Sequence, residues 1–331
     1  MPTSIYTDET IYKPELWARE GLQILFENIG LRGKVHQDFK DEIAEKGDTV
    51  NTRVPAIFTA QDTAADGGVT ATQNPQATKI TVTLDKNKEV TYPIRDVNNA
   101  KALVDLRNEF FEPAILAILR AIEDDGLAAL VHATNGFGDS TDSHVINAAV
   151  SGSPATPDTF KLLHIATAAF HLDDAKVPDD GRRHMVISHK QLLDLITAGG
   201  SSDLMLKANE LGGQSALRSR EIGTLFGMNL SMQQGVPTEA AAGSGYPNAI
   251  VDVAPFFHRN AASYISRPLP GVPPSTGAAV AVNNFADQAI RVAIGYSIMD
   301  KHTLMSVDVL YGWDVMRQEM GGVVKTANAL S

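Results

Sequence analysis

Several features that are common in enzymes and in secreted proteins are missing from this chain. None of its 331 residues is cysteine, which excludes disulfide bonds and any thiolate nucleophile or metal ligand. This usage fits a reducing compartment such as a cytoplasm. The chain also has no run of basic residues, and its formal net charge is −11. Because neutralising phosphates requires clustered lysine and arginine, we do not expect strong or sequence-specific binding of nucleic acid.

Long apolar stretches are missing as well. No segment approaches the roughly 18 apolar residues of a membrane-spanning helix, so we expect no membrane partner. The first twenty residues carry acidic side chains and no apolar core, unlike a signal peptide. Apolar residues nevertheless make up 44% of the chain, which is enough for one large or two medium domains with a proper core.

Motifs for catalysis or metal binding are also missing. His164 and His171 lie two turns apart on one expected helix, about 10.5 Å between Cα atoms at about 1.5 Å per residue, too far to share a metal ion. Ser140, Asp142 and His144 share one loop, whereas a hydrolytic triad draws its members from separated elements. We therefore assign no catalytic, cofactor-binding or metal-binding residue and expect no enzyme and no cofactor. A soluble α+β hydrolase using this loop is the alternative from another class.

The most informative segment that is present covers residues 47–94. It predicts two long strands, 47–58 and 79–94, joined by about twenty small, polar or turn-forming residues. In the second strand, apolar side chains occupy even positions and polar ones odd positions, which is the alternation of a strand. Such a strand spans roughly 50 Å, against a radius of gyration near 20 Å for a compact chain of this length. We therefore expect this ribbon to bury its apolar face on another copy.

Helices and strands are mixed through the rest of the chain. Residues 13–30 predict an amphipathic helix that contains Trp17, and residues 113–134 predict the longest helix, with Pro113 in its first turn. On the long helix we expect Ile115, Ile118 and Ile122 to face inward, and Arg120, Glu123 and Asp124 to form a polar stripe.

Further elements complete an α+β pattern. We expect Phe160, Leu163, Ala166 and Phe170 to share one face of a helix over 159–172. The other expected elements are a strand over 183–188, a helix over 190–196, a strand over 248–253, a helical segment over 254–260, and strands over 288–299 and 304–313 that continue through GGVVK.

The order of these elements, with several local phrases, resembles the major capsid proteins of tailed double-stranded DNA phages, which adopt the Hong Kong ninety-seven fold. The matching phrases are EKGDTVNTRVPA (45–56) before the family's E-loop, FFEPAILAILRAIEDDGLAALV (110–131) at its spine helix, HMVISHKQLLDL (184–195) and IGTLFGMNLSMQQGVP (222–237) in its A-domain, FHRNAASYISRP (257–268), and VDVLYGWDVMRQEMGGVV (307–324) in its closing strand. Gln318 stands where the family often has proline, which implies a looser turn there.

The resemblance implies a division of the chain into an N-terminal arm (1–46), an E-loop hairpin (47–95), a P-domain (96–150 and 296–331) and an A-domain (151–295). It implies that the protein self-assembles into hexamers and pentamers of an icosahedral shell that encloses double-stranded DNA. The shell would assemble in the host cytoplasm and form part of the virion. Further implied partners are a separate scaffolding protein, a portal and a possible decoration protein. The alternative within this fold is an encapsulin-type nanocompartment shell.

Candidate contacts between subunits lie on the arm, the hairpin and the spine helix. They are Trp17, Arg53, Lys79, Lys86, Lys88, Glu89, Arg120 and Glu123. The hairpin lysines suit ion pairs with a neighbour or protection of a strand edge, more than phosphate binding. Some members of the family cross-link a hairpin lysine to an asparagine. No partner asparagine can be assigned here, so we expect a shell without covalent links.

Overall fold

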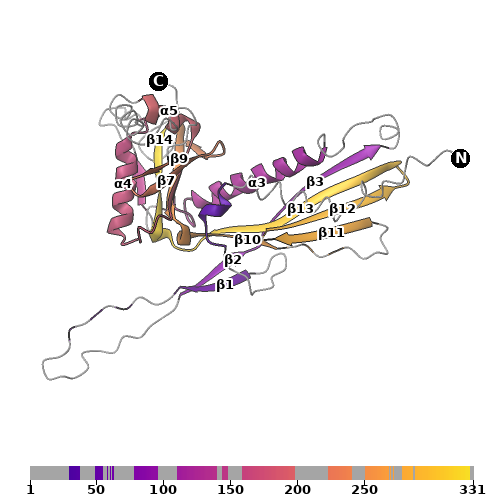
Figure 1. The fold of residues 1–331 in the computed structure, drawn as a ribbon, viewed down its shortest axis with the longest axis horizontal. Coiled ribbons are helices and arrows are strands. Elements are labelled where there is room, and N and C mark those ends of the chain that lie inside the picture. The colour runs from indigo at the N-terminus through magenta and orange to yellow at the C-terminus, as the bar shows by residue number, and fades with distance from the viewer. Residues whose placement is uncertain are drawn as a thin grey trace.

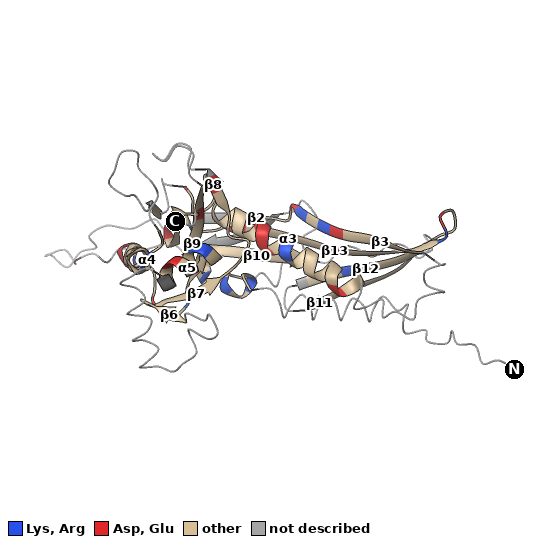
Figure 2. Ribbon diagram, turned by 90° about the horizontal axis from the view of Figure 1, so that it is seen from above, with Lys and Arg blue, Asp and Glu red and all other residues tan. Residues whose placement is uncertain are grey.

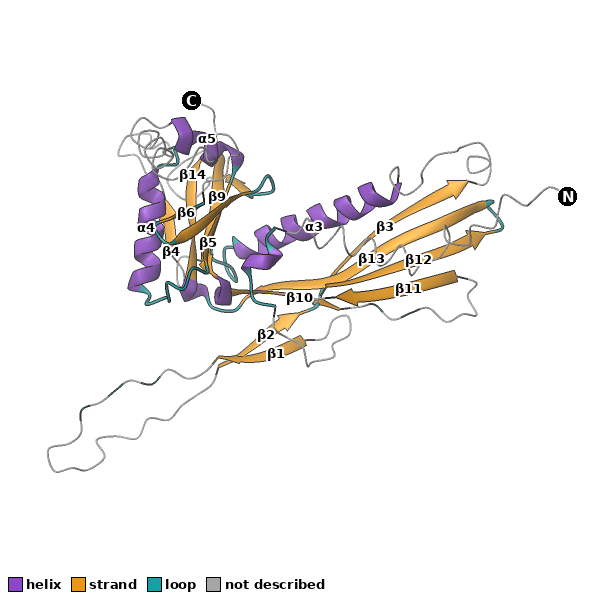
Figure 3. Ribbon diagram, viewed as in Figure 1, coloured by secondary structure: helices purple, strands orange, loops and turns teal. Residues whose placement is uncertain are grey.

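Two β-sheets organise the part of the chain that the structure describes. The structure is a computed structural model, and it describes residues 30–37, 49–54, 58, 60, 62, 78–95, 110–139, 144–147, 159–197, 223–240, 250–267, 269, 271, 278–285 and 288–328. A long five-stranded sheet runs beside helix α3 (Glu112–Leu130), and a seven-stranded sheet gathers with helices α4 (Leu162–Asp174) and α5 (His189–Thr197) at one end of the molecule (Figures 1 and 3).

The five-stranded sheet is entirely antiparallel and is built around its longest strand. The strand order is β10-β13-β12-β11. β3 lies outside this order and pairs with residues 302–311 of β13. The strands are β3 (Lys86–Arg95), β10 (Ala262–Arg267), β11 (Ala278–Phe285), β12 (Gln288–Ser297) and β13 (His302–Val315). The predicted strands over 288–299 and 304–313 are thus confirmed as β12 and β13.

Helix α3 packs on this sheet with the face that its sequence predicts. Pro113 lies in the first turn, and Ile115, Ile118 and Ile122 are buried. A Cβ added at Gly126 would lie 2.7 Å from the Trp313 ring, so only glycine allows the helix to approach β13 this closely. The helix ends at Leu130, four residues before the predicted end.

The seven-stranded sheet mixes parallel and antiparallel pairs in the order β4-β14-β9-β5-β7-β6, with β8 paired to β9. Its strands are β4 (His144–Asn147), β5 (Arg183–Ile187), β6 (Thr224–Leu225), β7 (Met228–Met232), β8 (Thr238–Ala240), β9 (Ile250–His258) and β14 (Gly321–Ala327). The predicted strand over 183–188 and the helix after it are confirmed. Ser188 and Gln191 form a capping box at the start of α5: Ser188 Oγ accepts from the Gln191 amide, and Gln191 Oε1 accepts from the Ser188 amide.

The prediction of one unbroken strand over 79–94 is wrong. Leu84 and Asp85 interrupt it, so that β2 (Thr78–Thr83) pairs with β1 (Thr49–Val54), while β3 joins the five-stranded sheet. The expected alternation does hold, since Val82 and Leu84 are buried and their odd-numbered neighbours are exposed. Half of the ribbon therefore buries its apolar face within its own subunit. Among the described strands, the β1–β2 pair extends away from the two larger sheets (Figure 1).

Two helical predictions are adjusted by the structure. Leu163 and Phe170 share the exposed face of α4, at 67% and 64%, whereas Ile165 and Leu172 are buried. Phe160, expected on the same face as Leu163, lies just before the helix and is buried. The expected helical segment over 254–260 is instead the second half of β9 followed by a 3-10 turn, Arg259–Ala261. Its apolar residues form a continuous run, which suits a buried strand as well as a helix.

The closing strands also differ from the prediction. The segment GGVVK does not continue β13, because a 3-10 turn at Gln318–Met320 sends the chain into the seven-stranded sheet as β14. Gln318 is the first residue of this turn. Its side-chain amide donates to the carbonyls of Thr134 (3.2 Å) and Gly136 (3.3 Å) in the loop after α3, so the turn is tied to that loop.

Candidate assembly surfaces

The histidines and carboxylates do not assemble a reaction centre in the described residues. No group of three among the described histidines and carboxylates is placed to hold a metal ion. His171 on α4 stacks on His144 of β4, with ring centroids 4.7 Å apart, and Ser140 and Asp142 lie outside the described residues. The described helices include none that is long and apolar enough to cross a bilayer.

The polar stripe of α3 borders a groove between the two sheets. The groove has a volume of about 600 Å³ and is lined from α3 by Leu119, Arg120, Glu123 and Asp124. Its facing wall is Met232, the last residue of β7, with Gln233, Gln234 and Gly235 after it. The structure therefore brings Arg120 and Glu123 together, as expected. Sequence reasoning missed the facing wall, because nothing in the phrase MQQG indicates that it lies opposite the long helix.

Glu123 has a specific partner within its own subunit. Its carboxylate accepts hydrogen bonds from the backbone amides of Gly30 (2.7 Å) and Leu31 (3.3 Å). Arg120, one turn away on the same helix, is exposed. Of these two candidate contact residues, Arg120 is therefore the one available to a neighbour.

Lys88 is also engaged within the subunit. Its ammonium lies 3.1 Å from the Asp125 carboxylate of α3, and the Tyr311 hydroxyl donates to the same carboxylate oxygen at 2.7 Å. Burial, followed by the contact with Asp125, raises the pKa of Tyr311 well above its usual range. Burial and the Asp125 charge likewise raise the pKa of Asp124. This arrangement ties α3 to β3 and β13.

The other candidate contact residues lie at the surface or outside the described side chains. Lys86 and Glu89 are exposed on β3, opposite Tyr311 and Asp308 of β13 in the strand register. Arg53 and Lys79 are register partners in the β1–β2 pair. Trp17 and its expected helix lie outside the described residues. Figure 2 shows acidic and basic residues interspersed along α3 and β3, without a large field of one sign on that face.

Exposed apolar side chains mark further surfaces that the sequence reasoning missed. Ile298 and Met299, at 81% and 94% exposure, form the turn between β12 and β13 at the far end of the five-stranded sheet. Leu163 and Phe170 form the outward face of α4. Phe226 is half exposed and holds a positive φ of 50° in the β6–β7 turn, a conformation that is rare for a bulky residue. The spacing of Leu163 and Phe170 on one helix face was a visible signal, but the spacing does not show whether that face is buried or exposed.

Comparison with known proteins identifies the family. The phage capsid protein family matches residues 39–238, and no curated protein matches the chain. Among solved structures, the capsid of Ralstonia phage GP4 is similar with a TM-score of 0.66 and 14% identity, over 90% of this chain and 88% of that one. The capsid of cyanophage Pam1 gives 0.62 and 12%, over 89% and 88%. A structure from Mycobacterium phage Che8 gives 0.59 and 18%, over 88% and 89%.

These similarities confirm the predicted α+β fold of the Hong Kong ninety-seven type, and they favour neither the nanocompartment shell nor the hydrolase. The family match covers more than half of the chain, and the described residues fold into a long helix on an extended sheet beside a second, compact sheet. The chain therefore belongs to the phage capsid protein family, as a structural protein whose copies associate into the icosahedral shell of the virion.

Proposed function

We propose that copies of this chain form the hexamers and pentamers of a shell that assembles in the host cytoplasm and encloses double-stranded DNA. The observation that carries this proposal is the β1–β2 pair, which extends beyond both sheets (Figure 1). A two-stranded pair is marginally stable by itself in water, so it gains stability when it lies on a neighbouring subunit. Closed symmetry then uses each modest contact many times.

The candidate contacts divide into two groups on the basis of their surroundings. Arg53 and Lys79 on the projecting pair, Lys86 and Glu89 on β3, and Arg120 on α3 are proposed to contact neighbouring subunits, and Trp17 stays a prediction for the arm. Lys88 and Glu123 are proposed to act within the subunit, because they already bind Asp125 and the backbone of residues 30 and 31.

We also propose that the domains follow the two sheets more closely than the expected boundaries at 96–150, 151–295 and 296–331. β11 and β12, which fall mainly in the expected A-domain, belong to the long sheet, where β11 pairs with β12 and β12 pairs with β13. β14 and β4, which fall in the expected P-domain, belong to the compact sheet. In this division the P-domain is α3 with the five-stranded sheet, and the A-domain is the seven-stranded sheet with α4 and α5.

The proposed relation to DNA is confinement without specific recognition. A chain with a net charge of −11 has little means to neutralise phosphates. A scaffolding protein, a portal and a decoration protein are proposed as further partners on the family resemblance alone.

Size measurement tests the shell, and a deletion tests the hairpin. Expressed protein should elute as megadalton particles in size-exclusion chromatography and form closed shells in negative-stain micrographs. Removing residues 62–77 should abolish shells while the protein stays folded by circular dichroism, because the strands of both sheets lie elsewhere in the chain. A normal shell yield from the deleted chain would contradict the role of the hairpin, and a wild-type chain that stays a small species would contradict the shell itself.

A further inference from the structure

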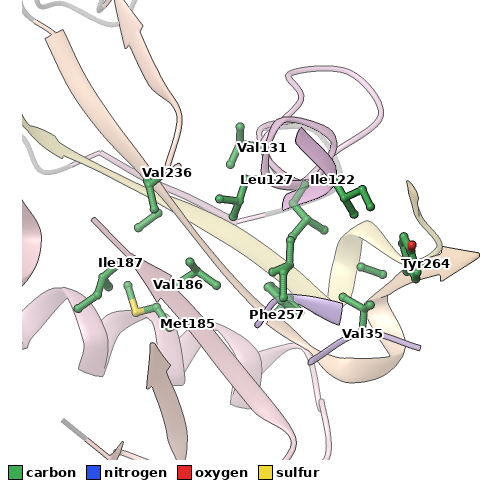
Figure 4. Close-up of a cluster of buried hydrophobic side chains, with 14 of the residues drawn as sticks. Val35, Ile122, Leu127, Val131, Met185, Val186, Ile187, Val236, Phe257 and Tyr264 are labelled. Atoms are coloured by element: carbon green, nitrogen blue, oxygen red, sulfur yellow. The ribbon is translucent and has the colours of Figure 1, made fainter. Parts of the chain in front are cut away.

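Residues 30–37, here called the junction segment, run through the place where the two sheets meet. The segment contains a single 3-10 turn, Arg32–Lys34. Leu31 and Val35 are completely buried, and Arg32 is 4% exposed. Figure 4 shows Val35 in a cluster with Ile122 and Leu127 of α3, Phe257 of β9 and Tyr264 of β10, among others. A short segment with this much burial is part of the core and not a loose tail.

The junction segment is bonded to both sheets and to α3. Its first amides donate to Glu123 on α3. The Lys34 ammonium donates to Ser231 Oγ on β7 at 2.6 Å, and burial lowers the pKa of this lysine while the nearby Glu123 opposes the shift. His36 extends the free edge of β10, since its amide donates to the Ala262 carbonyl (2.9 Å) and its carbonyl accepts from the Tyr264 amide (3.0 Å).

The backbone also crosses between the sheets at three places, and these crossings are bonded to one another. The 3-10 turn Arg259–Ala261 joins β9 to β10, and the chain from Val315 to Gly321 joins β13 to β14. The amides of Met316 and Arg317 both donate to the Ala261 carbonyl, at 2.8 and 3.1 Å. Gln318 ties the third crossing, after α3, to the same place. The connections between the two bodies are thus gathered in one place. Glu123 lies on α3 and Ser231 lies on β7, so bonds from one segment to both residues oppose a change in the angle between the bodies.

We propose that residues 30–37 form a clasp that holds the angle between the seven-stranded sheet and the α3-bearing sheet, with the bonds of Glu123 and Lys34 among its polar attachments. The clasp joins the sheets without being one of the backbone crossings. Resting on the proposed function, this assigns it a role in assembly, because the angle between the two bodies of each subunit determines the curvature of the shell.

The absence of native cysteine makes the clasp directly testable. Glu123→Ala removes the acceptor of two amides, and Lys34→Met removes the bond to Ser231. Glu112→Gln, at an exposed acid of the same helix, is the control. His36→Cys with Ser263→Cys places a disulfide between the partners of a parallel β-bridge. Paired backbones lie about 4.7–4.9 Å apart, which suits the Cα separation of about 4.4–6.8 Å in disulfides. The pair Thr91→Cys and Ser306→Cys, opposite each other within one sheet, is its control.

Hydrogen–deuterium exchange of the unassembled subunit measures the clasp independently of any shell. We expect exchange in residues 30–37 to rise about tenfold in Glu123→Ala and in Lys34→Met, as expected for the loss of one or two hydrogen bonds, and to stay unchanged in Glu112→Gln. Unchanged exchange in both attachment variants would overturn the clasp. If one of the two attachment variants fails to fold, exchange in the other variant still tests whether residues 30–37 form a clasp.

Shell diameters then test the consequence for curvature. Glu123→Ala should give shells of mixed diameter, and adding the oxidised His36–Ser263 cysteine pair should restore one diameter, whereas the Thr91–Ser306 pair should not. Uniform shells from Glu123→Ala would overturn the link to curvature. A wild-type chain that forms no shell would contradict the proposed function, while the exchange measurement would still judge the clasp.

Discussion

At the scale of single residues, two titratable groups near the junction are held away from their usual pKa. Asp314, at the end of β13, has its pKa raised to about 6, chiefly by burial and further by Asp85, although the Val315 amide bonds to its carboxylate. His184 of β5 has its pKa lowered to about 4, first by burial and then by the positive charges of Lys34, His258 and Arg259, against a smaller opposing effect of Asp180. Each group therefore makes stability depend on pH, with opposite sign.

We predict that Asp314→Asn stabilises the subunit at neutral pH. Because the folded pKa lies above the ordinary 3.8, ionisation in the folded state costs stability as pH rises from about 4 to 6, and the full cost is present above pH 6. Allowing for partial exposure, about 1–2 kcal/mol should be recovered at pH 7.5. Denaturant unfolding at pH 7.5 and pH 4 measures this gain. An equal gain at both values would show that ionisation is not its cause.

We predict that His184→Gln flattens the acid side of the stability curve. The folded pKa of His184 lies below the ordinary 6.5, so the unfolded chain binds its proton first, and stability falls as pH decreases from about 6.5 to 4. With allowance for exposure, the loss should be about 1–2 kcal/mol. Unfolding at pH 7 and pH 4.5, compared with the wild type so that Asp314 cancels, should show a smaller drop in the variant. A drop as large as that of the wild type would assign the acid sensitivity to other groups.

At the scale of elements, helix α4 shows which face of an amphipathic segment finds the core. Leu172 is completely buried and Leu163 is 67% exposed on the same helix. We expect Leu172→Ala to cost about 2–5 kcal/mol, since it removes buried volume. Leu163→Ala serves as the matched control and should change stability by less than about 0.5 kcal/mol. Urea unfolding of the unassembled subunit compares the two, and similar losses would contradict the orientation of α4.

The elements also show where a local pattern was sufficient. The inward face of α3 could be predicted because Ile115, Ile118 and Ile122 recur at helical spacing against a charged stripe. On α4, Ile165, Ala168 and Leu172 lie on the buried face, and other large apolar residues, Leu163 and Phe170, lie on the exposed face. Both faces therefore carry apolar side chains. A pattern of hydrophobicity cannot show how near the neighbouring strand lies.

At the scale of the whole molecule, the shell should be held together without covalent links between subunits. Lys88, one of the three hairpin lysines, is already paired with Asp125 in its own subunit. We expect purified shells to dissolve completely to a single band near 35.5 kDa after boiling in denaturant. A ladder of multiples on the gel would contradict this, and mass spectrometry of the bands would then locate the linked residues.

The sequence by itself determined the class of most elements, the strand alternation over residues 80–94, and the resemblance to the phage capsid family that the comparisons confirmed. Only the tertiary structure decided that β2 and β3 separate at Leu84 and join different sheets, and that α4 exposes Leu163 and Phe170. It also decided that the amide of residue 30 donates to Glu123, 93 positions away. The physical reason is that burial periodicity is a local property of the chain. The choice of partner depends on shape and on hydrogen bonds between segments that no short stretch of sequence contains.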